Sequence, residues 1–340
     1  MIVLLNGRKH TEHAYTHEAD FEQDIILHRR SLFGPAAVYI DAKKKIASQS
    51  LGAAVPDGFL FDLSDPRNRE FYLIEVELAK HDFFKHIFPQ ITKFFAFFTN
   101  PARQKELVEG LFAAINTDTS LKRQFKKYLG EEEVFKFLND IVDGSQNILL
   151  ILDGEKPELP EIMDTYTDTW GKMVKVMTVR KFVDKSTELF VAHPEFETIE
   201  YGPPDAEEDS GVYPEQFHLD GVSPEVREIY GALRKCVQDA HGGYVLNSRK
   251  YYVAIKGAKN LAFISTRKKK VRLVVILSEE EVRSRVKKHA IKVPSQAVQR
   301  YWGGTATEIM IEEPRNLGEV TSLIRDLMKQ YPPKASDEPD

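Results

Sequence analysis

Residues 56–78 read PDGFLFDLSDPRNREFYLIEVEL, and this stretch decides the expected fold. It consists of two apolar, aromatic segments on either side of the breaker cluster 64–68, which predicts two strands joined by a turn. Side chains two residues apart on a strand point to the same side, so Glu75 and Glu77 are expected to project together. The hairpin brings Asp57, just before the first strand, toward them.

Three carboxylates in this position have a chemical consequence. A charged carboxylate is costly to bury in an apolar strand, and two on one face repel each other unless they share a cation or a proton. Ligand sets made only of oxygen suit Mg²⁺ or Mn²⁺. The spacing therefore predicts a metal site, with an ordinary hairpin that carries solvated acids as the alternative.

The motif resembles that of the PD-(D/E)XK nuclease superfamily, in which Pro-Asp opens one strand and Glu-x-Lys lies on the next. Pro56-Asp57 and Glu75-Val76-Glu77 stand in those places, with Glu77 where the superfamily has lysine. A Glu-x-Glu version occurs in some active restriction endonucleases. The resemblance implies phosphodiester cleavage, with Asp57 and Glu75 as ligands of Mg²⁺ or Mn²⁺. Glu77 would be a further ligand or the water-orienting base.

The flanking helices offer further candidates through the same resemblance. Superfamily members often carry a glutamate on the helix before the core sheet, and Glu22 on the expected helix 17–27 matches it, with Glu18 as the rival. A glutamine faces the site in several branches, and Gln90 on the expected helix 82–98 resembles it. Lys93 and His86 share its face and are candidates for phosphate contact. The alternative for all of them is an exposed polar stripe.

The order of the remaining elements predicts an α/β fold with a restriction-endonuclease-like mixed sheet flanked by helices. Strands are expected at 36–42, 147–154 and 174–180, with a helix at 159–173 between the last two, which indicates a crossover with parallel strands. Residues 101–145 read as a helical insertion. Residues 1–17 are expected to be irregular and the lysines at 43–45 to form a turn. The nuclease-like domain is expected to cover residues 1–200.

A second domain is expected at residues 222–332, after an acidic linker at 201–221. A helix from Ser223-Pro224, four strands (251–255, 261–265, 271–277 and 307–311) and a helix at 317–330 make a small α+β layout. This layout resembles the DUF5655 domain, which is often attached to nuclease-like domains and has no settled biochemical role. The tail at 333–340 is expected to be disordered.

The two halves differ in charge. Residues 222–332 hold 21 Lys and Arg against 11 Asp and Glu, so they carry +10 and the remainder carries −15 of the formal net charge of −5. Basic residues near aromatic ones predict a nucleic-acid interface. The alternatives are a solvated surface or a surface that docks against the acidic half. The candidate contacts are Arg267, Lys268, Lys269, Lys270, Arg272, Lys287, Lys288 and, from the first domain, Lys93.

Composition limits the compartment and the class of function. The single cysteine, Cys236, excludes an intramolecular disulfide framework and favours a reducing cytoplasm, and no apolar run is long enough to span a membrane. The sequence therefore predicts a cytoplasmic, Mg²⁺-dependent nuclease with DNA as the expected substrate. A non-catalytic nucleic-acid-binding or adaptor protein on a nuclease-like fold is the first alternative, and a protein-interaction module is the second. A homodimer is a further hypothesis.

Overall fold

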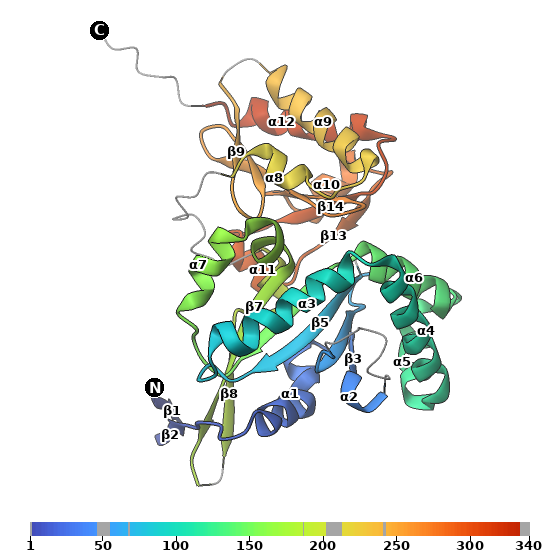
Figure 1. Ribbon diagram of the computed structural model, residues 1–340. Helices are drawn as coiled ribbons and strands as arrows, with labels where there is room; N and C mark the ends of the chain where they lie inside the picture. The colour runs from blue at the N-terminus through green and yellow to red at the C-terminus, as the bar shows by residue number, and fades with distance from the viewer. Residues whose placement is uncertain are drawn as a thin grey trace. The chain divides into compact units, whose positions relative to one another are not determined.

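The computed structural model describes residues 2–45, 55–66, 69–185, 187–201, 213–240 and 243–333. The chain divides into two compact units, Met1–Glu200 and Tyr201–Asp340, which are described one after the other (Figure 1). The first is built on a mixed sheet flanked by helices, and the second on an antiparallel sheet with helices. The predicted fold class is confirmed.

The sheet of the first unit has eight strands in the order β1-β2-β7-β6-β5-β4-β3, with β8 paired to β7. Strands β5, β6 and β7 are parallel neighbours and the other pairs are antiparallel. The central β5 and β6 are buried along their whole length, as expected for strands covered on both faces. The strands are β1 (Ile2–Leu5), β2 (Arg8–Glu12), β3 (Ala37–Asp41), β4 (Gly58–Asp62), β5 (Glu70–Glu77), β6 (Asn147–Leu152), β7 (Val174–Val183) and β8 (Glu188–His193).

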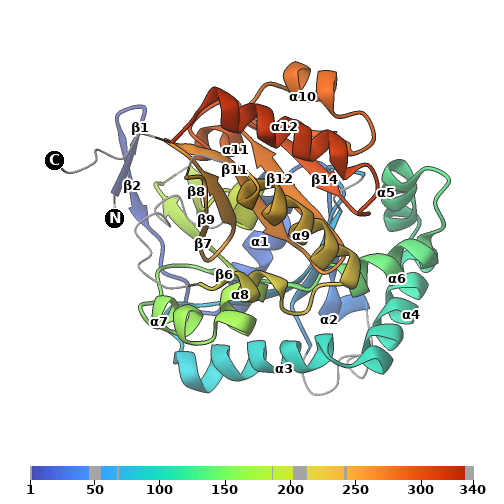
Figure 2. The same cartoon turned by 90° about the horizontal axis from the view of Figure 1, so that it is seen from above.

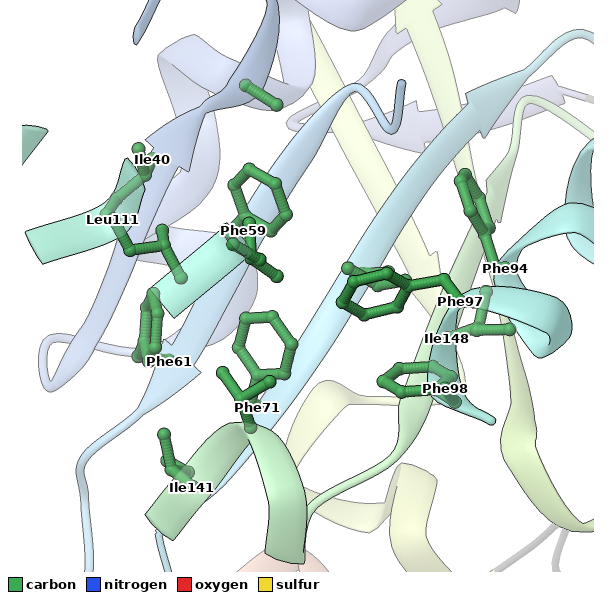
Figure 3. Close-up of a cluster of buried hydrophobic side chains, with 14 of the residues drawn as sticks. Ile40, Phe59, Phe61, Phe71, Phe94, Phe97, Phe98, Leu111, Ile141 and Ile148 are labelled. Atoms are coloured by element: carbon green, nitrogen blue, oxygen red, sulfur yellow. The ribbon is translucent and has the colours of Figure 1, made fainter. Parts of the chain in front are cut away.

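Helices cover both faces of this sheet. On one face α1 (Glu18–Phe33) buries Phe21 and Ile25 against alternate residues of β5 such as Ile74. On the other face Phe59, Phe61 and Phe71 join a core with the later helices (Figure 3). These helices are α3 (Phe88–Phe98), α4 (Pro101–Thr117), α5 (Thr119–Leu129) and α6 (Val134–Gly144), and shorter elements are α2 (Ala42–Lys45), a π-helical turn (Phe83–Ile87) and α7 (Glu158–Thr165).

Two expectations for the N-terminal region are wrong. Residues 1–17, expected to be irregular, contain the β1–β2 hairpin, which joins the sheet through β2 and β7 and the ion pair of Arg180 with Glu12. Most of its side chains are exposed, so it lacks the apolar alternation by which a strand is recognised. The lysines at 43–45, expected in a turn, belong to the short helix α2.

The second unit has a six-stranded antiparallel sheet in the order β13-β14-β12-β11-β10-β9. Its long helices α9 (Pro224–Gln238) and α12 (Leu317–Gln330) lie side by side and share one core with the sheet (Figure 2). The strands are β9 (Val245–Ser248), β10 (Val253–Lys256), β11 (Asn260–Thr266), β12 (Val271–Val275), β13 (Ala290–Lys292) and β14 (Thr307–Ile311), and the short helices are α8 (Glu215–Leu219), α10 (Glu279–Arg285) and α11 (Gln296–Tyr301).

The structure adds elements that the sequence did not predict in this unit. Strands β9 and β13 are short and largely half-exposed, so the four expected strands become six. Helix α8 lies within the stretch expected to be a linker, while residues 202–212 and 334–340 lie outside the described residues. In the part of the chain that is described, no helix has the length and apolarity needed to cross a membrane.

Gly58 of β4 lies close to Tyr39 of β3, and a substitution at this position tests how closely the two strands approach each other. A Cβ atom at Gly58 would overlap the ring of Tyr39, whereas a Cβ at Gly144, at the end of α6, would meet nothing within 4 Å. We expect Gly58→Ala to lower the free energy of unfolding by about 1–3 kcal/mol through overpacking. Gly144→Ala should be neutral or slightly stabilising. Urea denaturation of the two variants measures the difference, and equal stabilities would contradict the close approach.

Candidate metal centre

The hairpin places Asp57 beside Glu75. Strands β4 and β5 pair with Gly58 opposite Ile74, so the next position in this antiparallel register sets Asp57 opposite Glu75. The backbone confirms this placement, because Asp57 N–H donates to the Ile74 carbonyl at 2.9 Å. The Val76 N–H in turn donates to Asp57 Oδ2 at 2.7 Å. The two carboxylates therefore meet where β4 begins.

Burial makes the carboxylates of this group hard to ionise together. Asp57 and Glu75 are each 3% exposed and Glu77 is 7% exposed. Burial raises the pKa of Asp57 to about 6, although Lys43 and the Val76 N–H oppose the increase. Burial and the neighbouring Asp57 raise the pKa of Glu75 well above its ordinary value. A cation that neutralises them would relieve both effects.

Two buried polar atoms at this site have no hydrogen-bond partner among the described residues: Glu75 Oε2 and Tyr39 Oη. The Gln90 side chain from α3 hydrogen-bonds the Glu75 carboxyl group, so Glu75 keeps one oxygen without a partner. Tyr39 lies near Asp57, and burial together with that carboxylate raises the pKa of its hydroxyl. Buried atoms of this kind normally have partners, so both point to a missing ligand.

Lys43 was not predicted to belong to the site. Its Nζ forms an ion pair with Asp57 Oδ1 and lies 2.9 Å from Glu22 Oε2. Burial alone would lower the pKa of Lys43, but the two carboxylates outweigh it and the pKa is raised. Lys43 therefore stays charged and supplies one positive charge to the group. The sequence signal, a run of three lysines after a strand, suggested only a turn.

His81 extends the site on the far side of Glu77. Its Nδ1 lies 2.6 Å from Glu77 Oε2 and 3.5 Å from Glu18 Oε2, and donor atoms of the three residues lie within 4.8 Å of one another. Burial, followed by the charges of Glu77 and Asp57, raises the pKa of Glu18 to about 7.

The backbone before His81 is held from the chain that follows β6. Ala79 N–H donates to Asp153 Oδ1 at 2.6 Å, and Lys156 Nζ donates to the carbonyls of Ala79 at 3.0 Å and His81 at 2.5 Å. The ammonium group of Lys80 donates to the carbonyls of Tyr15 and Thr16 and not to a carboxylate of the site. The position of His81 depends on contacts distant in sequence, and for this reason the local pattern did not reveal it.

The donor set fits a divalent cation. Five carboxylates make up the group, and among the described side chains Lys43 and His81 are the cationic or protonatable groups in contact with them. If all five were ionised, the group would hold three or four more negative charges than positive ones, and the raised pKa values of Asp57, Glu75 and Glu18 show that burial opposes this. A divalent cation would replace protons that these carboxylates otherwise hold, and oxygen ligands with one imidazole suit Mn²⁺ or Mg²⁺. The carboxylates are Glu18, Glu22, Asp57, Glu75 and Glu77.

The other predicted residues of the first unit fall outside this group. Lys93 and His86 are exposed on the segment that carries Gln90, with the His86 ring centroid 5.6 Å from that of His81.

The basic candidates of the second unit lie in three settings. Residues 267–270 form the turn between β11 and β12, closed by a hydrogen bond of 2.8 Å from Arg267 N–H to the Lys270 carbonyl. Arg272, inside β12, is buried, unlike the neighbouring turn. Lys287 and Lys288 are exposed after α10, and their N–H groups donate to Glu319.

Comparisons with known proteins add little to this geometry. No protein-family model matches the chain, and no solved structure matches it. A protein of Haemophilus influenzae described as uncharacterized is 28% identical over 118 residues. The match covers 35% of this chain and 38% of the length of that relative, so it defines no shared activity.

The raised pKa of Asp57 predicts how stability changes with pH when metal is absent. Its pKa is 3.8 ordinarily and about 6 in the folded chain, so the folded state holds this proton more tightly. The resulting stabilisation is complete below about pH 4 and is lost as the pH rises through 6. Asp57→Asn should remove a decline on the order of 2 kcal/mol between pH 4.5 and 7.5. Urea denaturation in EDTA measures it, and an unchanged pH profile in the variant would contradict the assignment.

Proposed function

We propose that the first unit is a metal-dependent phosphodiesterase that cleaves nucleic acid, with DNA as the expected substrate. One observation carries the proposal: Asp57, Glu75 and Glu77 lie near one another in a buried position, where burial and the neighbouring carboxylates raise the pKa of Glu75 well above its ordinary value. The resemblance of the Pro-Asp…Glu-x-Glu motif to PD-(D/E)XK nucleases supports the same reaction. In this proposal the chain works in the cytoplasm.

The cofactor follows from the ligands. Asp57 and Glu75, with Glu22 nearby, would hold one cation, and Glu77 with Glu18 and His81 would hold a second. An imidazole nitrogen suits Mn²⁺ better than Mg²⁺, so the second position favours Mn²⁺. A divalent cation supplies an activated water nucleophile and offsets charge on the scissile phosphate.

The remaining groups have roles set by their contacts. As the alternative to a role as metal ligand, Glu77 would accept a proton from the attacking water, with its carboxyl group held by His81, whose Nδ1 lies 2.6 Å from Glu77 Oε2. Gln90 orients Glu75. Lys43, which now pairs with Asp57, would be able to offer its charge to a phosphate oxygen if Asp57 held a metal instead. In the second unit the half-buried turn at 267–270, with Lys269 exposed, and the exposed Lys287 and Lys288 would contact the substrate backbone.

A non-catalytic nucleic-acid-binding protein is the second candidate, and the position of Lys43 favours it. Its ammonium group already neutralises part of Asp57 and Glu22, which is how a nuclease-like site without metal would be stabilised. The two candidates differ in the role of Lys43. In the enzyme Lys43 would compete with the metal, and in the non-catalytic protein it would replace the metal permanently.

Cleavage assays test the leading proposal. We expect cleavage of single- or double-stranded DNA in Mn²⁺ or Mg²⁺, and we expect Glu75→Gln to reduce the rate roughly 100-fold or more, because it removes a ligand charge. RNA serves as the parallel substrate. Glu70→Gln is the matched control, since Glu70 is equally buried on β5 but hydrogen-bonds Ser145 and Asn147 away from the site.

Two results would contradict the proposal. One is a Glu75→Gln variant as active as the wild type. The other is a wild-type chain that cleaves no substrate and binds neither Mn²⁺ nor Mg²⁺ by calorimetry. The second result, with salt-sensitive DNA binding retained, would support the non-catalytic candidate.

Lys43→Met gives an independent prediction. Removing the ammonium group leaves Asp57 and Glu22 without their shared cation, so affinity for Mn²⁺ should rise by about tenfold or more. Calorimetry measures the affinity, and Lys93→Met serves as a control because Lys93 is an exposed lysine of the same unit. Equal Mn²⁺ affinity in the wild type and in Lys43→Met would show that Lys43 does not occupy a cation position.

A further inference from the structure

The second unit has a pocket of about 260 Å³ on its sheet. It opens on the face opposite α9 and α12, because Tyr252 and Ala254 belong to the small core on that side, while Val253 and Ile255 belong to the core with the helices. The residues that line it are Asn247, Arg249, Tyr252, Ala254, Lys256, Lys259 and Asn260.

Strand register explains why these residues meet. Tyr252, Ala254 and Lys256 are two residues apart along β10 and share one face. Asn247 of β9 is paired with Ala254, and Asn260 of β11 is paired with Lys256, so their side chains flank the same row. Ala254 is the smallest member of the row, and its methyl group leaves the floor of the pocket open between larger side chains.

All the charged side chains that line the pocket are positive. Its lining holds three cations, two amides and no acid. The turn that carries Lys259 is fixed, because a side chain at Gly257 would meet the Tyr331 carbonyl oxygen and the Tyr244 ring. Lys259 Nζ lies 3.7 Å from the centre of the Tyr331 ring, a cation–π contact that holds the ammonium group in place. An anion entering the pocket therefore meets charges that are already positioned.

We propose that this pocket binds the phosphate of a nucleotide, with Lys256, Lys259 and Arg249 on the phosphate and the two asparagines on the sugar or base. Arginine and lysine are the side chains that recognise phosphate, and an amide both donates and accepts hydrogen bonds as a sugar hydroxyl or a base edge requires. The volume is slightly below the roughly 300 Å³ at which pockets for drug-sized ligands begin, so one nucleotide fits better than an oligomer. Free nucleotides and the phosphorylated end of a nucleic-acid strand share this chemistry.

The pocket is distinct from the basic turn at 267–270. Asn260 begins β11 and the turn follows its last residue, Thr266, so a seven-residue strand separates them. At about 3.3 Å per residue, the end of the pocket with Lys256, Lys259 and Asn260 lies roughly 20 Å from the turn. The end with Arg249 and Tyr252 lies beside Ser265, close to the turn. Because Lys256 and Lys259 lie at the far end, binding at the pocket is separable by mutation from backbone contacts at the turn, and it does not depend on cleavage by the first unit.

Calorimetry of the full chain in EDTA tests the proposal with the first unit free of metal. The probes are AMP, GMP, CMP and UMP, a 5′-phosphorylated trinucleotide, the same trinucleotide without the phosphate, and inorganic phosphate. We expect at least one nucleoside monophosphate, or the phosphorylated trinucleotide, to bind more tightly than inorganic phosphate. If a nucleoside monophosphate binds more tightly than the phosphorylated trinucleotide, the ligand is a free nucleotide. The reverse order indicates the end of a nucleic-acid strand.

Charge-removing variants locate the binding. Lys256→Gln and Lys259→Gln should each weaken it by about tenfold or more, since each loses a charged contact to the phosphate. Lys235→Gln and Lys329→Gln are the matched controls, because both are exposed cations of the same unit, on α9 and α12, outside the pocket lining. Circular dichroism checks that all four variants fold.

Three outcomes would overturn the proposal. The first is no binding of any phosphate-bearing probe. The second is that no nucleoside monophosphate and no phosphorylated trinucleotide binds more tightly than inorganic phosphate. The third is equal weakening by the pocket variants and the controls, which would indicate attraction by the net charge of the unit alone.

Discussion

The repulsion among buried carboxylates at the end of β5 is the constraint on which the first unit depends. Asp57 and Glu75 face each other across two strands that are almost closed to water, and Glu77 follows on the same side. Such groups cannot all ionise without compensation, because the low-dielectric interior strengthens their repulsion. The surrounding polar groups compensate for part of it: Lys43 by charge, Gln90 and the Val76 N–H by hydrogen bonds, and His81 at Glu77.

The fold creates this constraint by making β5 a central strand. Its parallel neighbour β6 and its antiparallel partner β4 occupy both edges, and helices cover both faces. Its alternate residues therefore enter two different cores: Phe71 and Leu73 pack with α3, and Ile74 and Val76 pack on the α1 side. Glu75 and Glu77 continue the first series to the end of the strand, so their burial follows from the same alternation that builds the core. The contacts of Asp153 and Lys156 then bring His81 to this end.

The sequence predicted what depends on local spacing and missed what depends on distant contacts. Two-residue periodicity placed Glu75 and Glu77 on one face, and the hairpin brought Asp57 to them. Strands with continuous apolar runs, such as β6, and helices with capped ends, such as α9, were also predictable. Tyr39, Lys43 and His81 were not, because each reaches the site from another element. The strands β1, β2, β9 and β13 escaped prediction because they have only three to five residues and little burial: β1 is a short apolar run and β2 is wholly polar, so neither alternates between apolar and polar residues.

Lys43 gives this arrangement a consequence for folding. A site with excess negative charge opposes folding until a cation binds, and any cation that binds only the folded state stabilises it by mass action. Lys43 is a cation that the chain carries itself, so part of this stabilisation is independent of metal concentration. The ammonium group of Lys43 contributes only one positive charge. Other carboxylates of the site remain uncompensated, because Glu75 has an oxygen without a hydrogen-bond partner and the pKa of Glu18 is raised. The lysine therefore offsets one charge of the carboxylate group, and the raised pKa values of Asp57, Glu75 and Glu18 show that the rest of the group resists full ionisation.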